Sequence, residues 1–145
     1  MSVRVLQSSD DDLIVYDVFG VVTIDEVMAC RQTILQLPPE VRHDLSQFVL
    51  CRDTASIRLT PVELRQFAML QAAFAPGARR VYLVPDPIAF SLARMYASVK
   101  EGASGRFQFV ETIEEAASLL GVTTDVLDGI LNGERGETLR VVDGC

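Results

Sequence analysis

Short apolar runs alternate with longer amphipathic stretches along most of the chain. Each run is rich in β-branched and aromatic side chains, which favour β-strands. These predicted strands lie at residues 3–7, 13–19, 47–51, 80–84 and 107–110. A polar turn at residues 8–12 separates the first two strands, so the chain is predicted to open with a hairpin.

The stretches between the strands carry helix start signals. A Thr-x-x-Glu capping box, whose two side chains satisfy exposed backbone N–H groups, begins at Thr23, Thr60 and Thr112. Asp86 stands before a proline at the fourth start. Apolar residues then recur at helical spacing and define one buried face for each helix. After Thr60 that face is predicted to contain Leu64, Phe67, Ala68 and Phe74; after Asp86 it is predicted to contain Ile88, Leu92, Met95, Tyr96 and Val99.

This order of elements, β-β-α-β-α-β-α-β-α, predicts an α/β domain over residues 1–121. We expect a mostly parallel sheet of four to five strands, with an antiparallel hairpin strand and about four helices that cover both faces. Gly121 supplies the last helix stop. Residues 122–145 then form an amphipathic extension with a short helix and a stray strand at 139–142. The extension either lies against the domain or reaches a second subunit, and the second alternative predicts a homodimer through residues 122–142.

Composition narrows the class of protein. With 145 residues, 49% of them hydrophobic and 23% charged, the chain is predicted to be one globular domain rather than a disordered or fibrous chain. No run approaches the roughly 18 apolar residues that span a membrane, and no signal peptide is apparent, so we expect no membrane association and a cytoplasmic location. Cys30, Cys51 and Cys145 match neither a disulfide framework nor a zinc spacing. We expect Cys30 and Cys51 to be small buried hydrophobes.

The net charge of −7 argues against nucleic acid as a partner, because a phosphate-binding protein is expected to be basic. Positive charge is nevertheless concentrated in residues 71–110. Two interpretations of this basic patch remain open, a solvated face or an anion site. Its residues are Arg79, Arg80, Arg94, Lys100 and Arg106.

No catalytic motif is present: the sequence lacks a nucleophile elbow, a P-loop, a dinucleotide fingerprint, and the common zinc-protease and Cys-x-x-Cys motifs. The only histidine, His43, is predicted to lie in a polar loop. We therefore expect no enzyme, no cofactor and no metal. Were the chain an enzyme after all, its first candidates would be Tyr16, Asp17 and Asp53, provided that they meet in one pocket.

In an open parallel sheet, ligands gather outside the carboxyl ends of the strands, where helix N-termini present free N–H groups. Ser56 and Thr60 place hydroxyls beside such a helix start, where an added phosphate would be stabilised. The structural alternative is that Thr60 is only a cap and Ser56 only a loop residue. The regulatory or anion-binding candidates at this edge are Arg52, Asp53, Ser56, Arg58, Thr60, Asp86 and Arg94.

Three segments carry a resemblance to a known family: Phe-Val-Leu-Cys-Arg-Asp at residues 48–53 before a capped helix, Val-Tyr-Leu-Val-Pro-Asp at 81–86, and Phe-Ser-Leu-Ala-Arg-Met-Tyr at 90–96. With them, residues 3–121 resemble the STAS-like single-domain proteins, which are similar to bacterial anti-sigma-factor antagonists. The resemblance implies a module that docks a partner kinase or regulator and switches by phosphorylation at Ser56 or, less well by position, Thr60. The family's Asp-Ser-x-Gly run is replaced here by Asp-Thr-Ala-Ser at residues 53–56.

Two functions therefore remain open. The first is a non-enzymatic regulatory or protein-interaction module. The second is a small anion- or metabolite-binding domain that uses the helix N-termini at the carboxyl edge. A related CRAL-TRIO-like sheet holds lipid in other proteins, but we expect this chain to be too short to enclose one.

Overall fold

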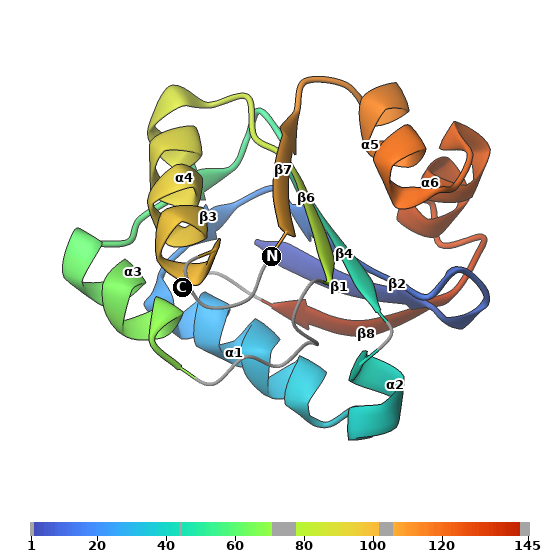
Figure 1. The fold of residues 1–145 in the computed structure, drawn as a ribbon, viewed down its shortest axis with the longest axis horizontal. Helices are drawn as coiled ribbons and strands as arrows, with labels where there is room; N and C mark the ends of the chain where they lie inside the picture. The colour runs from blue at the N-terminus through green and yellow to red at the C-terminus, as the bar shows by residue number, and fades with distance from the viewer. Residues whose placement is uncertain (1, 44, 71–77, 102–105, 143–145) are drawn as a thin grey trace.

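The computed structural model describes residues 2–43, 45–70, 78–101 and 106–142. A central sheet is flanked by helices on both faces (Figure 1). Its six strands are β1 (Val3–Ser8), β2 (Leu13–Val18), β4 (Ser46–Cys51), β6 (Arg79–Leu83), β7 (Arg106–Val110) and β8 (Glu137–Val142). The α-helices of the described residues are α1 (Ile24–Leu35), α2 (Pro39–His43), α3 (Pro61–Ala68), α4 (Pro87–Glu101), α5 (Ile113–Leu120) and α6 (Thr124–Leu131).

The strand order across the sheet is β7-β6-β4-β2-β1-β8. Neighbours from β2 to β7 run parallel, whereas β1 is antiparallel to both β2 and β8. The predicted α/β class, with a mostly parallel sheet and an opening hairpin, is confirmed. The sheet has one strand more than expected, because β8 pairs with β1 at the edge.

Successive residues of each strand face opposite sides of the sheet and so build two cores. One core lies under α1, α3 and α4, and the other lies under α5 and α6 (Figure 1). In β2, for example, Ile14 and Tyr16 face the first core, while Leu13 and Val15 face the second. Because both faces are covered, the central strands are apolar on both sides, as is usual for parallel sheets.

The helix starts follow the sequence signals closely. Thr60 and Glu63 form the full capping box at α3, with N···O distances of 3.1 and 2.9 Å. At α1 the Glu26 carboxylate accepts from the backbone N–H of Thr23 at 2.7 Å, and Thr112 accepts from the third residue of α5 at 3.1 Å. Gly121 ends α5 with a φ of 73°, the left-handed conformation for which glycine is favoured.

The segment after Gly121 lies against the domain, the first of the two alternatives. Leu127 and Ile130 of α6 are fully buried in the second core. Gly136, with a φ of 78°, lets the chain pass so close to β1 that a side-chain Cβ there would clash with the carbonyl oxygen of Gln7. The residues predicted as an extension thus supply a core helix and an edge strand.

The predicted buried face of α4 is wrong at three positions. Ile88 is 71% exposed, and Met95 and Val99 are also exposed. The helix turns Ala89 and Ala97 inward instead. The helix has two apolar stripes, and hydrophobic periodicity alone cannot decide which of them packs on the sheet, because packing depends on size as well as polarity.

Smaller elements were not expected from the sequence. Two-residue strands β3 (Val21–Val22) and β5 (Ser56–Ile57) form a separate parallel ribbon, and α2 replaces a predicted loop. Phe74, which was predicted on the helix after Thr60, lies outside the described residues. In the described part of the chain, none of the helices has the length and apolarity needed to cross a bilayer.

Candidate functional site

A cavity of about 250 Å³ lies between the sheet and helices α1, α3 and α4. The cavity is lined on the sheet side by four strands: Val3 of β1, Tyr16 and Val18 of β2, Gln47, Val49 and Cys51 of β4, and Arg80 and Tyr82 of β6. The parallel register places Val49 between Tyr16 and Tyr82 at the centre of this floor.

Small side chains on α4 leave this space open. Ala89 and Ala93 line the cavity one helical turn apart, where larger residues would fill it. Phe67 of α3 and Leu92 of α4 were predicted to be buried against the sheet but are only half-buried, in the cavity wall. The wall is largely apolar, so a ligand body that entered would displace water from apolar surface.

The polar groups of the cavity include two buried cations. Arg80 is 5% exposed and Lys100 is 7% exposed. Gln47 and Arg80 are register partners, each the second residue of its strand, so these groups mark the amino ends of β4 and β6. The described lining residues include no carboxylate. The cavity therefore has an apolar body and a positive end.

The buried position of Lys100 affects both its hydrogen bonding and its pKa. Its Nζ donates to the carbonyl oxygen of Leu70 at 2.9 Å, and an ammonium group has two further N–H donors. Burial, together with the positive charges of Arg80 and Arg31, lowers the pKa of Lys100 from 10.5. Nearby negative charge would reverse this effect and favour the charged ammonium.

Arg80 is held by an aromatic contact rather than by an acid. Its guanidinium carbon lies 4.9 Å from the ring centre of Phe107, a cation–π distance. Its buried Nε has no hydrogen-bond partner among the described residues. A buried N–H without a partner costs about 1–3 kcal/mol, so such groups are rare in folded proteins.

Three tyrosine hydroxyls and the Cys51 thiol around the cavity stay protonated near neutral pH. Burial is the main cause that raises the pKa of Tyr16, Tyr82 and Tyr96 above the usual 10.0. Burial, with the charges of Asp17 and Asp86, raises the pKa of the Cys51 thiol from 9.0 to about 12. Tyr16 donates to the side-chain oxygen of Gln47 at 3.2 Å. These groups can therefore act as neutral hydrogen-bond donors, and Cys51 is not a thiolate.

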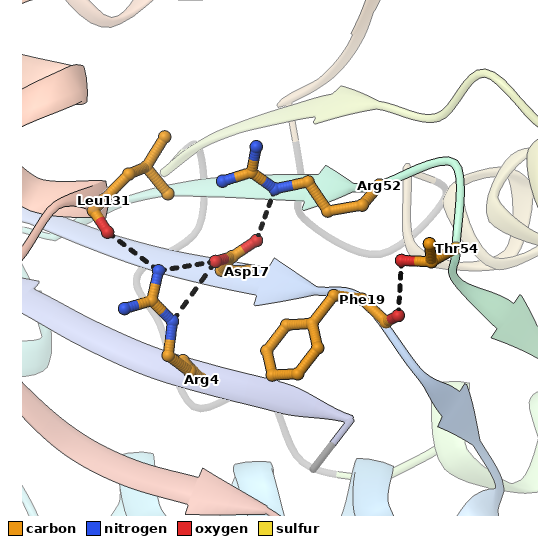
Figure 2. Close-up of polar contacts among 6 residues, drawn as sticks. All are labelled: Arg4, Asp17, Phe19, Arg52, Thr54 and Leu131. Carbon is orange, nitrogen blue, oxygen red and sulfur yellow. Dashed lines mark hydrogen bonds and ion pairs between the residues drawn. The ribbon is translucent and has the colours of Figure 1, made fainter.

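Asp17 forms a separate cluster on the opposite face of the sheet (Figure 2). This buried carboxylate accepts from Nε and Nη2 of Arg4, at 3.2 and 2.6 Å, and from Nε of Arg52 at 2.9 Å. Arg4 Nη2 also donates to the carbonyl oxygen of Leu131 at 2.8 Å. The cluster thus ties the end of α6 to strands β1, β2 and β4.

The first candidates for an enzyme do not meet in one pocket. Tyr16 and Asp17 are neighbours in β2, so their side chains face opposite sides of the sheet. Tyr16 lines the cavity, Asp17 binds the two arginines, and Asp53 is exposed after β4. His43 is exposed as well. Within the described ranges, no group of three His, Cys, Asp or Glu residues is placed to hold a metal ion.

The seven residues predicted at the carboxyl edge lie outside the cavity lining. Thr60 caps α3, Asp86 accepts from the N–H of Ala89 at 2.9 Å, and Arg52 pairs with Asp17. Arg94 lies over the ring of Phe109, 5.4 Å from its centre. The remaining three are exposed, with Ser56 in β5: Asp53, Ser56 and Arg58.

The basic patch separates into two groups. Arg79 and Arg94 are exposed, whereas Arg80 and Lys100 are buried in the cavity; the side chain of Arg106 lies outside the description. Cys30 and Cys51 are buried, as predicted, and Cys145 is not described. A signal for the cavity does exist in the sequence, since Lys100 follows Tyr96 by four residues and so shares its face of the helix. Which arginine of the Arg79–Arg80 pair faces inward depends on strand pairing.

Comparison of the chain with protein-family models, with curated proteins and with solved structures found no match.

Proposed function

We propose that this chain is a binding domain that holds a small, largely apolar molecule in the cavity under α1, α3 and α4. The observation that carries the proposal is the free volume of about 250 Å³ beside a tightly packed sheet. Protein interiors are packed about as densely as organic crystals, so a void of this size is unusual.

The volume limits the size of the ligand. A dry apolar cavity of about 150 Å³ is enough to bind benzene, and typical ligand sites enclose about 300–1,000 Å³. This cavity lies between them, which suits a molecule of roughly ten non-hydrogen atoms by scaling from benzene. The proposal places binding inside one face of the domain, not at the helix N-termini beyond the carboxyl edge. The expectation that the chain is too short to enclose a lipid stays a prediction, because a molecule of this size is smaller than a lipid.

Filling the cavity from the sheet side is expected to abolish binding. The Val49→Phe variant places a ring at the centre of the cavity floor, so octanol should no longer raise the melting temperature, whereas it raises that of the unchanged chain. Val62→Phe is the matched control, because Val62 is 62% exposed on α3. Circular dichroism checks that both variants fold. Equal octanol-induced shifts in both variants would contradict binding in the cavity.

A second candidate is the interaction module that the STAS-like resemblance implies. It is supported by the order of the elements and by three exposed apolar side chains, Ile88, Met95 and Val99 of α4. Their spacing of seven and four residues places them on one helix face, and apolar surface of this kind often marks a contact with another protein. We propose self-association through this face rather than through residues 122–142.

Sedimentation at increasing protein concentration tests this second candidate. The unchanged chain should shift from monomer to dimer, and Met95→Asp should remain monomeric at the same concentrations because a charge is costly in an apolar contact. Gln66→Asp, at an exposed polar position of α3, serves as the control. A chain that stays monomeric at the highest concentration would rule out the dimer.

A further inference from the structure

We propose that the ligand of the cavity is an anionic amphiphile whose carboxylate or phosphate head binds Arg80 and Lys100, while its apolar body lies along Val49 toward α3 and α4. This inference rests on the proposed binding function and adds the charge and orientation of the ligand. The head group would lie at the amino ends of β4 and β6, and the body would lie in the apolar part of the cavity.

Arg80 supplies the first argument. Its side chain is 95% buried, lines the cavity, and leaves its Nε–H without a partner in the described structure. A guanidinium group presents several donors in a planar fork that fits carboxylate and phosphate oxygens. The contact with Phe107 holds this fork in place from one side. An anion in the cavity would therefore meet a buried guanidinium on a lining that offers no described carboxylate.

Lys100 supplies the second argument from a different element. It reaches the cavity from α4, whereas Arg80 reaches it from β6. Two buried cations near one another repel, and a buried charge is costly unless it is paired. The described cavity lining offers no carboxylate to compensate them. A ligand that brings one or two negative charges would remove this cost, whereas a neutral ligand would not.

The remaining polar groups suit the same head group. Gln47 lies in the floor of the cavity as the register partner of Arg80, and the Tyr16 hydroxyl donates to its side-chain oxygen. The amide N–H groups of Gln47 are neutral donors that can complete the hydrogen bonds of an oxyanion. A positively charged ligand would meet two buried cations of the same charge here, so the site should select against amines.

Isothermal titration calorimetry with four probes of one chain length tests the inference: octanoate, octyl phosphate, octanol and octylamine. Charge-assisted hydrogen bonds contribute about 1.5–3 kcal/mol, so we expect octanoate or octyl phosphate to bind about 10- to 100-fold more tightly than octanol. Octylamine should bind more weakly than octanol. The better of the two anions identifies the head group.

Arg80→Met should remove this preference, so that the anion and octanol bind with similar affinity. Arg94→Met is the matched control, because Arg94 also lies over a phenylalanine ring but is exposed and does not line the cavity. It should retain the full preference for the anion. Lys100→Met, a second variant at the same end of the cavity, should reduce the preference and guards against a folding defect specific to Arg80→Met.

The outcomes separate this inference from the function on which it rests. Equal affinity of the unchanged chain for octanol and for both anions would overturn the anionic head group and leave the apolar binding function intact. A preference for the anion that survives in Arg80→Met and Lys100→Met would also overturn the assignment. If none of the four probes binds, the proposed function fails as well.

Discussion

The Asp17→Asn variant is expected to unfold about 3 kcal/mol more easily than the unchanged chain. Its carboxylate is 4% exposed and forms ion pairs with both Arg4 and Arg52. Removing one partner of a buried ion pair typically costs about 3–5 kcal/mol, because the remaining charge is left uncompensated. We expect the lower end of that range, since the side chains of Arg4 and Arg52 are 28% and 45% exposed and can turn toward water.

Urea denaturation measures this effect, with Asp53→Asn as the control. Asp53 is an exposed aspartate just after β4. Its substitution should therefore change the free energy of unfolding by less than about 0.5 kcal/mol. A loss below about 1 kcal/mol for Asp17→Asn would show that the arginine cluster does not hold α6 to the sheet.

The Ile130→Ala variant is expected to lose about 2–5 kcal/mol of stability. Ile130 of α6 is fully buried in the second core, so the substitution removes apolar contacts and leaves a cavity. The matched control is Ile88→Ala, the same substitution at a position that is 71% exposed on α4, where the change should be within about 0.5 kcal/mol.

This pair of variants also tests two differences between the sequence analysis and the structure. Ile130 lies on α6, which was predicted to belong to an extension of the domain. Ile88 lies on the face of α4 that was predicted to be buried. A large loss of stability for Ile88→Ala, or a negligible loss for Ile130→Ala, would contradict the packing of α4 or α6.

We likewise expect a chain shortened at residue 121 to be unfolded, because it would lack both α6 and β8.

The fold could be predicted from the sequence where local chemistry determines it. Capping residues such as Thr60 and the stop at Gly121 act through their own backbone neighbours, so their positions are legible. The inward face of α4 could not be predicted in this way, because the alanines of the helix and its larger apolar residues form two competing apolar stripes. Strand β8 was also not predicted as part of the sheet, because its pairing with β1 joins residues 130 or more positions apart.

The candidate site could be predicted only in part. The concentration of basic residues around Arg80 and Lys100 is visible in the sequence, and an anion site was one of its two interpretations. Its location was not predictable, since ligands of open parallel sheets usually bind beyond the carboxyl ends of the strands. Here the cations lie at the amino ends, under the helices. Burial depends on which strands pair, and that information is not local.

The most direct test of the central claim is a nuclear magnetic resonance titration of the isotope-labelled chain with octanoate. If the ligand binds in the cavity, saturable shifts should be concentrated at residues such as Val49, Tyr82 and Ala93, and at the Nε–H of Arg80. Saturable shifts centred on Ser56 and Thr60 at the carboxyl edge, with the cavity residues unchanged, would contradict the account.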